Sequence, residues 1–229
     1  LMNPNVGLIR VELYDGKGFV ELIDMMPRIV SSGRFADMAV VQSARISYGE
    51  VLKSINADNN LIGYLWSHKH TTPFESVSFQ IRARMPIFVA RQVMRHRLFS
   101  YNEISYRYQQ PKDEFYYPEI RFQDDENRQM SKPDEDLSDE ERAKLKKANH
   151  YYRLAKHEFD GDELDEPGPW GNYKIITNHG VAREVARTIL PQSLMTEMLI
   201  KGNARTWLHF LKLRMEIGAQ KEIRDLADA

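Results

Sequence analysis

Hydrophobic and polar residues alternate most regularly between residues 76 and 85. Every odd position in this segment is apolar (Val, Phe, Ile, Ala and Met), and every even position is Ser, Gln or Arg. This period of two predicts a β-strand with one buried face. Pro86 follows directly, and because proline suits the first turn of a helix, we expect a helix from Ile87 to about Arg95.

Weaker patterns along the rest of the chain predict further elements. Ser138 with Glu141 three residues later is a capping-box signal, and Asn203 suits the N-cap of the last helix. The polar stretches 123–137 and 160–172 are predicted to be exposed loops. The remaining predictions are strands at Arg10–Tyr14 and Met195–Ile200, a short apolar segment ending at Pro27, and helices at Phe35–Ile46, Leu61–His68, Ser138–Phe159, Val181–Leu190 and Ala204–Ile217. This mixture predicts an α+β fold, with a single domain over residues 1–229 and a helical insertion at about 123–172.

The composition of the chain excludes several classes of function. The 229 residues are 42% hydrophobic, which is enough for a real core. With 32 Lys and Arg against 33 Asp and Glu, the near-neutral charge argues against a general nucleic-acid or membrane-surface binder. No apolar run approaches a membrane span, and the N-terminus lacks a signal-peptide layout, so we expect a cytoplasmic protein. The absence of cysteine excludes disulfides, thiolate metal sites and cysteine nucleophiles.

Three potential cations, Arg95-His96-Arg97, stand together near the expected end of the helix after Pro86. A helix C-terminus favours cations, so one interpretation is a solvated basic cap. Gln92 lies three residues before Arg95, and the two would share a helix face that a ligand can contact.

The segment 102–108 carries a mixture of groups that suits a nucleotide. If it is extended, Glu103, Ser105 and Arg107 lie on one side. Arginine binds phosphate through bidentate contacts, while serine adds hydrogen bonds and glutamate accepts from ribose hydroxyls. The alternative is the ordinary surface of a β-sheet.

Arg95-His96-Arg97, followed after seven residues by Ser105, resembles the signature of the flavin-dependent thymidylate synthases. The fuller run Ser100-x-Asn102-Glu103-x-Ser105-x-Arg107-Tyr108 is also similar to that family. The resemblance to the family is good over residues 44–48, 68–108 and 180–222, and it is poor over residues 1–35 and the insertion. The other segments that resemble the family are His68-x-His70-x-Thr72-Pro73-Phe74-Glu75, Pro86 to Gln92, Arg183-Glu184-x-Ala186-Arg187-x-x-Leu190-Pro191, Asn203-Ala204-Arg205 and Leu213-Arg214.

The resemblance implies a fold, an activity and an assembly. Members of this family make dTMP from dUMP with methylenetetrahydrofolate as the carbon donor, and FAD carries reducing equivalents that NADPH supplies. The implied fold is an antiparallel sheet with long helices, and the implied assembly is a homotetramer with active sites shared between subunits. The missing cysteine is consistent, because a flavin hydride route requires no thiolate nucleophile.

The resemblance also assigns residues to ligands. Arg214 matches the catalytic arginine, which favours ionisation at N3 of the uracil. The dUMP-binding set is Gln92, Val93, Met94, Arg95, Glu103, Ile104, Ser105, Tyr106, Arg107, Arg187 and Arg214. The FAD-binding set is Ser47, His70, Thr72, Arg95, His96, Arg97, Glu103, Asn203, Ala204, Arg205 and His209.

Helical spacing gives a physical reading of the C-terminal residues. Arg205 and His209 are four apart and share a face, which suits one ligand. Arg214 is five beyond His209 and points elsewhere on the helix, which suits a different ligand. Glu184 lies three before Arg187 and is placed to orient it. His209 departs from family members that have Asn at this position, which affects only the detail of its contact.

Other interpretations of these residues make different predictions. His68 and His70 form half of a metal site, but no third ligand is evident, so we expect no metal. Ser105 lacks the G-x-S-x-G elbow of a hydrolase nucleophile. A nucleic-acid module would stack bases on the interleaved aromatic residues from Phe99 to Tyr108, but the chain is not basic overall. A flavin-binding homologue without catalysis would lack Arg214, Arg187 or Ser105, and all three are present.

Overall fold

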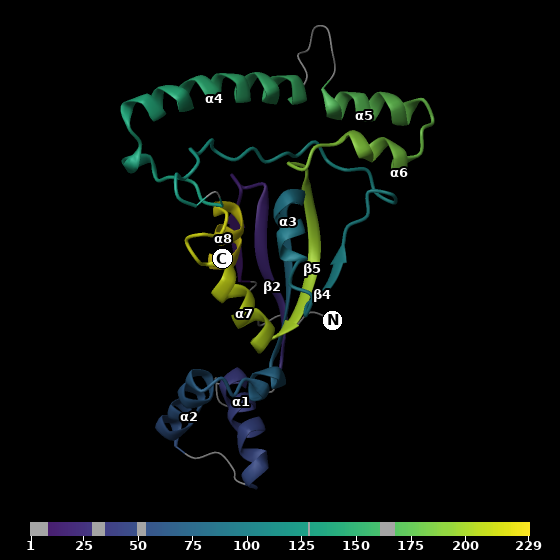
Figure 1. Cartoon of the computed structure of the whole chain (residues 1–229). Coiled ribbons are helices and arrows are strands. Elements are labelled where there is room, and N and C mark those ends of the chain that lie inside the picture. Colours follow the sequence, from purple (N-terminus) through teal and green to yellow (C-terminus); the bar gives the residue numbers. More distant parts are fainter. Residues whose placement is uncertain (1–8, 29–34, 50–53, 128, 161–167) are drawn as a thin grey trace.

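The computed structural model describes residues 9–28, 35–49, 54–127, 129–160 and 168–229 (Figure 1). Its strands are β1 (Arg10–Leu13), β2 (Gly18–Met26), β3 (Ser78–Pro86), β4 (Ser100–Glu103) and β5 (Met195–Asn203). Its α-helices are α1 (Phe35–Arg45), α2 (Ile55–Ser67), α3 (Ile87–Val93), α4 (Asp139–Asp160), α5 (Pro169–Asn178), α6 (Arg183–Ala186), α7 (Ala204–Arg214) and α8 (Lys221–Asp228). Short 3-10 turns include Thr72–Ser76 and Arg187–Ile189. None of the helices in these ranges is long and apolar enough to cross a membrane.

The five strands form one antiparallel sheet in the order β1-β2-β3-β5-β4. In β3 the predicted alternation is confirmed, because Ala83 and Met85 are fully buried and lie opposite Met198 and Thr196 of β5. Helices α3, α7 and α8 cover this apolar face (Figure 1). The α+β class and the antiparallel sheet are therefore as expected.

The polar positions of β3 face the other side of the sheet, where charged side chains pair with one another. Arg82 lies 2.6 Å from Glu197 of β5 and 3.7 Å from Glu21 of β2. Arg84 pairs with Glu114, which lies on the segment that follows β4. Cross-strand pairs of opposite charge stabilise an antiparallel sheet and help to fix its register.

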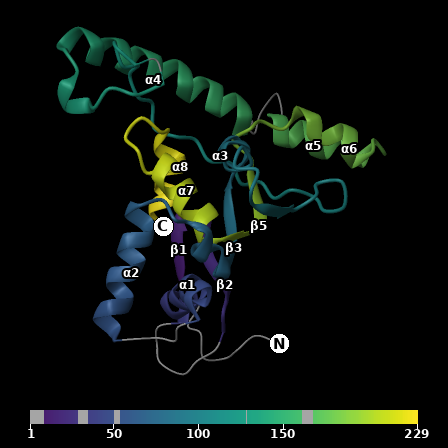
Figure 2. The ribbon, with the colours of Figure 1, turned by 60° about the horizontal axis from the view of Figure 1, so that its bottom comes forward.

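Helices gather at the two ends of the sheet. In Figures 1 and 2, α4, α5 and α6 lie across one end, and α1 and α2 lie at the other. The capping box that begins α4 is confirmed, since the Ser138 amide donates to the Glu141 carboxylate at 2.7 Å and the Glu141 amide donates to Ser138 Oγ at 3.3 Å. Asn203 likewise caps α7 by accepting from the Thr206 amide at 2.9 Å.

Helix α3 ends at Val93, so the prediction that it continues to Arg95 is wrong. Phe99 is buried against Trp207, with ring centroids 4.4 Å apart, and this packing draws the chain away from the helical path. The Tyr101 hydroxyl lies 2.7 Å from the Val93 carbonyl oxygen and 2.8 Å from that of His96. It thereby satisfies groups that the helix leaves open at its end.

Gly202 of β5 lies directly beneath this turn. A Cβ atom at that position would collide with the Phe99 ring. Glycine is therefore required by the close approach of the strand to the turn, rather than by an unusual backbone angle.

Several other helix and strand boundaries differ from those that the sequence predicted. The apolar segment before Pro27 is a full strand, β2, and α2 begins at Ile55, where Ser54 Oγ accepts from the Ala57 amide. Part of the loop predicted at 160–172 is the first turn of α5, which Gly168 and Pro169 begin. Residues 161–167 of that prediction lie outside the described residues. Helix α8 was not predicted at all.

Candidate functional site

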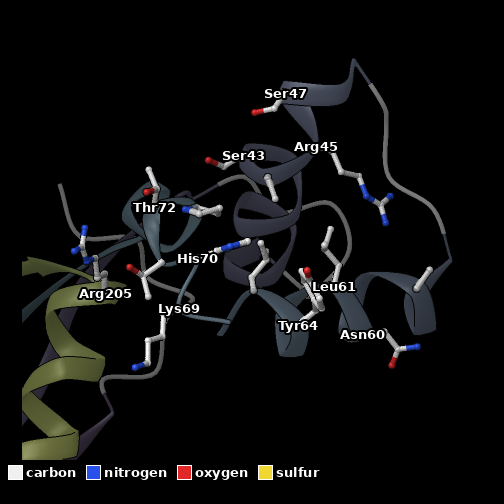
Figure 3. Close-up of a pocket in the computed structure, with 15 residues that line it drawn as sticks. Ser43, Arg45, Ser47, Asn60, Leu61, Tyr64, Lys69, His70, Thr72 and Arg205 are labelled. Atoms are coloured by element: carbon white, nitrogen blue, oxygen red, sulfur yellow. The ribbon is translucent and has the colours of Figure 1, made fainter. Parts of the chain in front are cut away.

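A cavity of about 1300 Å³ lies where α1 and α2 meet the 69–73 segment and the start of α7 (Figure 3). Four residues of the predicted FAD-binding set line it, namely Ser47, His70, Thr72 and Arg205. The other lining residues are Ser43, Ala44, Arg45, Ala57, Asn60, Leu61, Tyr64, Leu65, Lys69, Thr71 and Pro73. The volume exceeds the usual range of small-molecule pockets, so the cavity is large enough for a dinucleotide.

One wall of the cavity depends on a buried ion pair between α1 and α2. Arg45 Nη2 lies 2.8 Å from Asp58 Oδ1, and their side chains are only 7% and 6% exposed. Because each charge would be costly to bury alone, the pair holds the two helices together.

The floor of the cavity is set by the end of α2. Lys69 has a φ of 61°, in the left-handed region where glycine is usual, and its amide donates to the Trp66 carbonyl oxygen at 3.1 Å. This turn closes the helix and directs His70 to the cavity (Figure 3). A non-glycine residue in this conformation is strained, and such strain tends to occur at functional sites.

The cavity combines cations, hydroxyl groups and apolar surface. Lys69 and Arg205 supply positive charge, and Arg205 also pairs with Glu75. Ser47 and Thr72 add hydroxyl donors, while Tyr64 offers an aromatic ring. A dinucleotide needs cations for its pyrophosphate and apolar or aromatic surface for its rings, so this donor set fits FAD.

A second cluster surrounds Arg214 at the other end of α7. Its Nε donates to Nε2 of His96 at 2.9 Å, and its Nη2 donates to the Gln92 carbonyl oxygen at 3.3 Å. The His209 ring also faces His96, with centroids 6.1 Å apart. Arg214 and His209 thus flank one histidine, although their spacing predicted separate directions.

The histidine of this cluster is held in its neutral form. Because Nε2 accepts from Arg214, the ring proton is placed on Nδ1. Burial, with the nearby Arg214 and His209, lowers the pKa of His96 from 6.5 to about 4. Partial burial also lowers the pKa of the Arg214 guanidinium, which nevertheless stays charged near neutral pH.

We expect stability to depend on pH through His96. Its pKa is lower in the folded chain, so its contribution is fully present above about pH 6.5 and is lost as the pH falls through about 4. NMR titration of the His96 ring measures this directly. The Arg214→Ala variant should raise the pKa of His96, because one positive charge is removed. An unchanged midpoint in that variant would contradict the assignment.

The extended conformation that would place Glu103, Ser105 and Arg107 on one side ends at Glu103, with β4. The Tyr108 and Gln109 amides donate to the Ser105 carbonyl oxygen, which closes a turn. Glu103, Ser105 and Arg107 therefore do not form one side of a strand. Glu103 instead accepts from the Thr196 hydroxyl at 2.6 Å.

The rest of this segment is anchored to β5 and to α6. The Ile104 amide donates to the Glu197 carbonyl oxygen at 2.9 Å, and Tyr106 donates to that of Met195. Arg107 lies 3.3 Å from Glu184 of α6. The prediction that Glu184 orients Arg187 is therefore not what the contacts show, and the exposed Arg187 lies on the next turn.

The predicted residues thus fall into three groups. The first group lines the cavity described above. The second group surrounds Arg214 and contains Gln92, His96 and His209. In the same segment Val93 is buried, whereas Met94, Arg95 and Arg97 are exposed in the turn. The third group contains residues 103–107 and Arg187. Asn203 and Ala204 join β5 to α7, between the first two groups. Among the contacts of the described residues, none links the third group to Arg214.

Sequence reasoning missed several cavity residues, including Ser43, Asn60, Tyr64 and Lys69. Lys69 stands within the His68-x-His70 segment, so its position was a usable signal. Tyr64 lies one helical turn before His68, and the two rings stack with centroids 4.0 Å apart. Helical spacing would have placed these two side chains together.

Two alternative interpretations can be compared with these contacts. Phe99 is buried and the Tyr106 hydroxyl is bound to the backbone, so neither is an open stacking platform for a base. Within the described ranges, no group of three or more His, Asp or Glu is placed to hold a metal ion. The His68 and His70 rings lie 6.4 Å apart and pack around Tyr64.

The chain is similar to known proteins over most of its length. The family model described as thymidylate synthase complementing protein matches residues 28–229. A flavin-dependent thymidylate synthase from Thermus thermophilus is 44% identical over 93% of this chain and 70% of its own length. The enzyme of that name from Dictyostelium discoideum is 39% identical over 95% of this chain and 67% of its own.

Solved structures show the same fold. A crystal structure of the UMP/dUMP methylase PolB from Streptomyces cacaoi, bound with 5-Br dUMP, aligns with a TM-score of 0.68 at 29% identity. The alignment covers 92% of this chain and 87% of that one. With the family model matching residues 28–229, the chain belongs to the thymidylate synthase complementing protein family.

Proposed function

We propose that this protein is a flavin-dependent thymidylate synthase that methylates dUMP reductively to dTMP. The observation that carries the proposal is the placement of two arginines on α7. Arg205 lines a cavity of dinucleotide size, and Arg214 at the other end of the helix is held by His96 and Gln92. One rigid helix thereby connects a cofactor pocket with a cationic group suited to an anionic base.

FAD would be held in the cavity between α1, α2 and α7. Lys69 and Arg205 supply charge for its pyrophosphate, and Ser47, His70 and Thr72 supply hydrogen bonds. When bound, the flavin supplies the reducing equivalents for the methyl transfer. We assign NADPH as the source of these equivalents and methylenetetrahydrofolate as the carbon donor, as the family resemblance implies.

The dUMP base would lie beside Arg214. A guanidinium at the uracil edge stabilises negative charge as N3 loses its proton, which activates the base. The hydrogen bonds to His96 and Gln92 hold Arg214 in place before the substrate arrives, so little reorganisation is needed. Arg95 is exposed in the same turn and is available to a ligand.

We assign the dUMP phosphate to the third group, which contains residues 103–107 and Arg187. Arg107 and Arg187 are exposed cations on neighbouring segments, and Ser105 lies in the turn before Arg107. Because these side chains make no contact with the Arg214 group among the described residues, we propose that a site combines groups from different subunits. A homotetramer in the cytoplasm with shared sites, as in the family, meets this requirement.

The first test is the absorbance spectrum of the purified protein. We expect bound FAD, a spectral change on adding dUMP, and release of the C5 hydrogen of dUMP when the flavin is reduced. A colourless protein that takes up no FAD would refute the proposed function.

The cavity assignment is tested by Arg205→Ala. Loss of one charged hydrogen-bonding group should weaken FAD binding about 10- to 100-fold, measured by fluorescence titration of the released flavin. Lys201→Ala is the matched control, because Lys201 is an exposed cation on β5 that does not line the cavity. Equal FAD affinity in both variants would place the cofactor elsewhere.

A further inference from the structure

A line of polar side chains runs from the core of the protein to the Arg214 group. Its inner end is Glu222 of α8, whose side chain is completely buried. Arg121 Nη2 lies 2.8 Å from Glu222 Oε1 and donates to Oε2 at 3.0 Å, and Gln220 Nε2 donates to the same Oε2 at 2.7 Å. Gln220 Oε1 in turn accepts from Gln92 Nε2 at 2.7 Å.

The position of α8 makes this line rigid at its inner end. Ile223, Leu226 and Ala227 pack into the main core, and the Tyr14 hydroxyl donates to the Glu222 carbonyl oxygen at 2.8 Å. Gln220 is the N-cap residue of the helix, and its carbonyl oxygen accepts from the Ile223 and Arg224 amides. The Gln220 backbone is therefore held at the start of α8, while the residue itself lies at the exposed surface.

The chemistry of the line allows only one direction of hydrogen bonding. A guanidinium only donates, and an ionised carboxylate only accepts. The Gln220 amide must therefore turn its NH₂ toward Glu222 and its oxygen toward Gln92. That oxygen can only accept, so Gln92 must offer its own NH₂.

We propose that Gln220 and Glu222 are positioning residues that fix which end of the Gln92 side-chain amide is left for the nucleotide. One Nε2–H of Gln92 donates to Gln220, which orients the amide, and the Gln92 Oε1 has no partner among the described residues. Gln92 thus presents an acceptor to a donor group of the nucleotide, either the base N3–H or the sugar hydroxyl. The inference rests on the proposed function, because it takes dUMP as the ligand.

Gln92 also links this line of side chains to Arg214, the proposed catalytic arginine. The Gln92 backbone carbonyl oxygen accepts from Arg214, while its side chain is oriented by Gln220. The pair of half-buried Arg121 and buried Glu222 therefore influences the nucleotide contact without touching the nucleotide.

Two variants test the proposal. Glu222→Gln keeps the shape but allows the 222 side chain to donate, so the Gln220 and Gln92 amides are no longer forced into one orientation. Gln220→Met keeps the length and removes the connection. In each, we expect the dUMP dissociation constant to rise about tenfold while FAD affinity is unchanged. Lys221→Ala is the matched control, because Lys221 is exposed and pairs only with Asp225 on its own helix.

Substrate analogues identify the donor and separate positioning from general damage. N3-methyl-dUMP lacks the N3–H, and 2′,3′-dideoxy-UMP lacks the sugar hydroxyl. One of them should bind the wild type more weakly than dUMP, and that difference should disappear in Gln220→Met. The proposal is overturned if both variants bind dUMP like the wild type, or if FAD affinity and melting temperature of Gln220→Met fall together with dUMP affinity. Failure of the wild type itself to bind dUMP would instead contradict the proposed function.

Discussion

Replacing Arg214 with alanine is expected to lower the turnover of dUMP by about 10²- to 10³-fold while FAD stays bound. Two hydrogen bonds, one to His96 and one to the Gln92 carbonyl oxygen, hold the Arg214 guanidinium in place. Its removal takes away charge stabilisation that matters most once N3 of the uracil ionises. The cavity proposed for FAD lies at the opposite end of α7, so its lining residues remain intact.

Lys212→Ala provides the matched control for this experiment. Lys212 is an exposed cation in the same last turn of α7, and no site contact is assigned to it. The rate of dTMP formation and the flavin content of each variant are the measurements. Near-normal turnover in Arg214→Ala, or loss of flavin from it, would remove Arg214 from the catalytic role. Arg214→Lys should recover little, because an ammonium group cannot reproduce both hydrogen bonds.

Replacing Asp58 with alanine is expected to lower the free energy of unfolding by about 3–5 kcal/mol. The change removes the carboxylate that lies 2.8 Å from the Arg45 guanidinium, and the two side chains are only 7% and 6% exposed. The removed ion pair joins α1 and α2, which line the cavity, so FAD affinity should fall as well. Urea denaturation gives the stability, and flavin titration gives the affinity.

A double variant separates the charge from the packing. Arg45→Met combined with Asp58→Leu removes both charges and should recover most of the lost stability. Breaking the exposed Lys144–Glu140 pair of α4 serves as the comparison, and it should cost no more than about 0.5 kcal/mol. If Asp58→Ala costs as little as that exposed pair, the ion pair does not hold the cavity wall.

Sequence patterns were most informative where packing and local preference agree. The alternation in β3 predicted both the strand and its buried face, because cross-strand neighbours such as Met198 repeat the same alternation. The capping signals of Ser138 and Asn203 located the starts of two helices, since each satisfies amide groups within one turn. These effects depend on residues close together in the sequence.

The failures occurred where distant segments decide the local structure. The helix after Pro86 stops at Val93 because Phe99 and Tyr101 hold the following turn, and neither influence is visible in the helical pattern. The pairing of Arg107 with Glu184 joins segments that are far apart in the chain. Helix α8 carried a readable spacing of apolar residues at Ile223, Leu226 and Ala227, so its omission was avoidable.

The sequence proposed the candidate site as a set of residues but not as an arrangement. The family resemblance predicted FAD-binding and dUMP-binding sets, and the fold places these predicted residues in groups on different elements. The buried Glu222 and its partner Gln220 entered only through the structure, because their significance depends on contacts with Arg121 and Gln92.

The absence of a side chain at Gly202 has a consequence for mutational tolerance. The turn with Arg95 to Arg97 rests on β5 at this one position, where the Phe99 ring fills the space that any Cβ would need. Neighbouring Lys201 is exposed, whereas any side chain at position 202 would force the Phe99 ring to move. Variation at the exposed side chains of the turn is therefore expected to be tolerated more readily than variation at the glycine on which the turn rests.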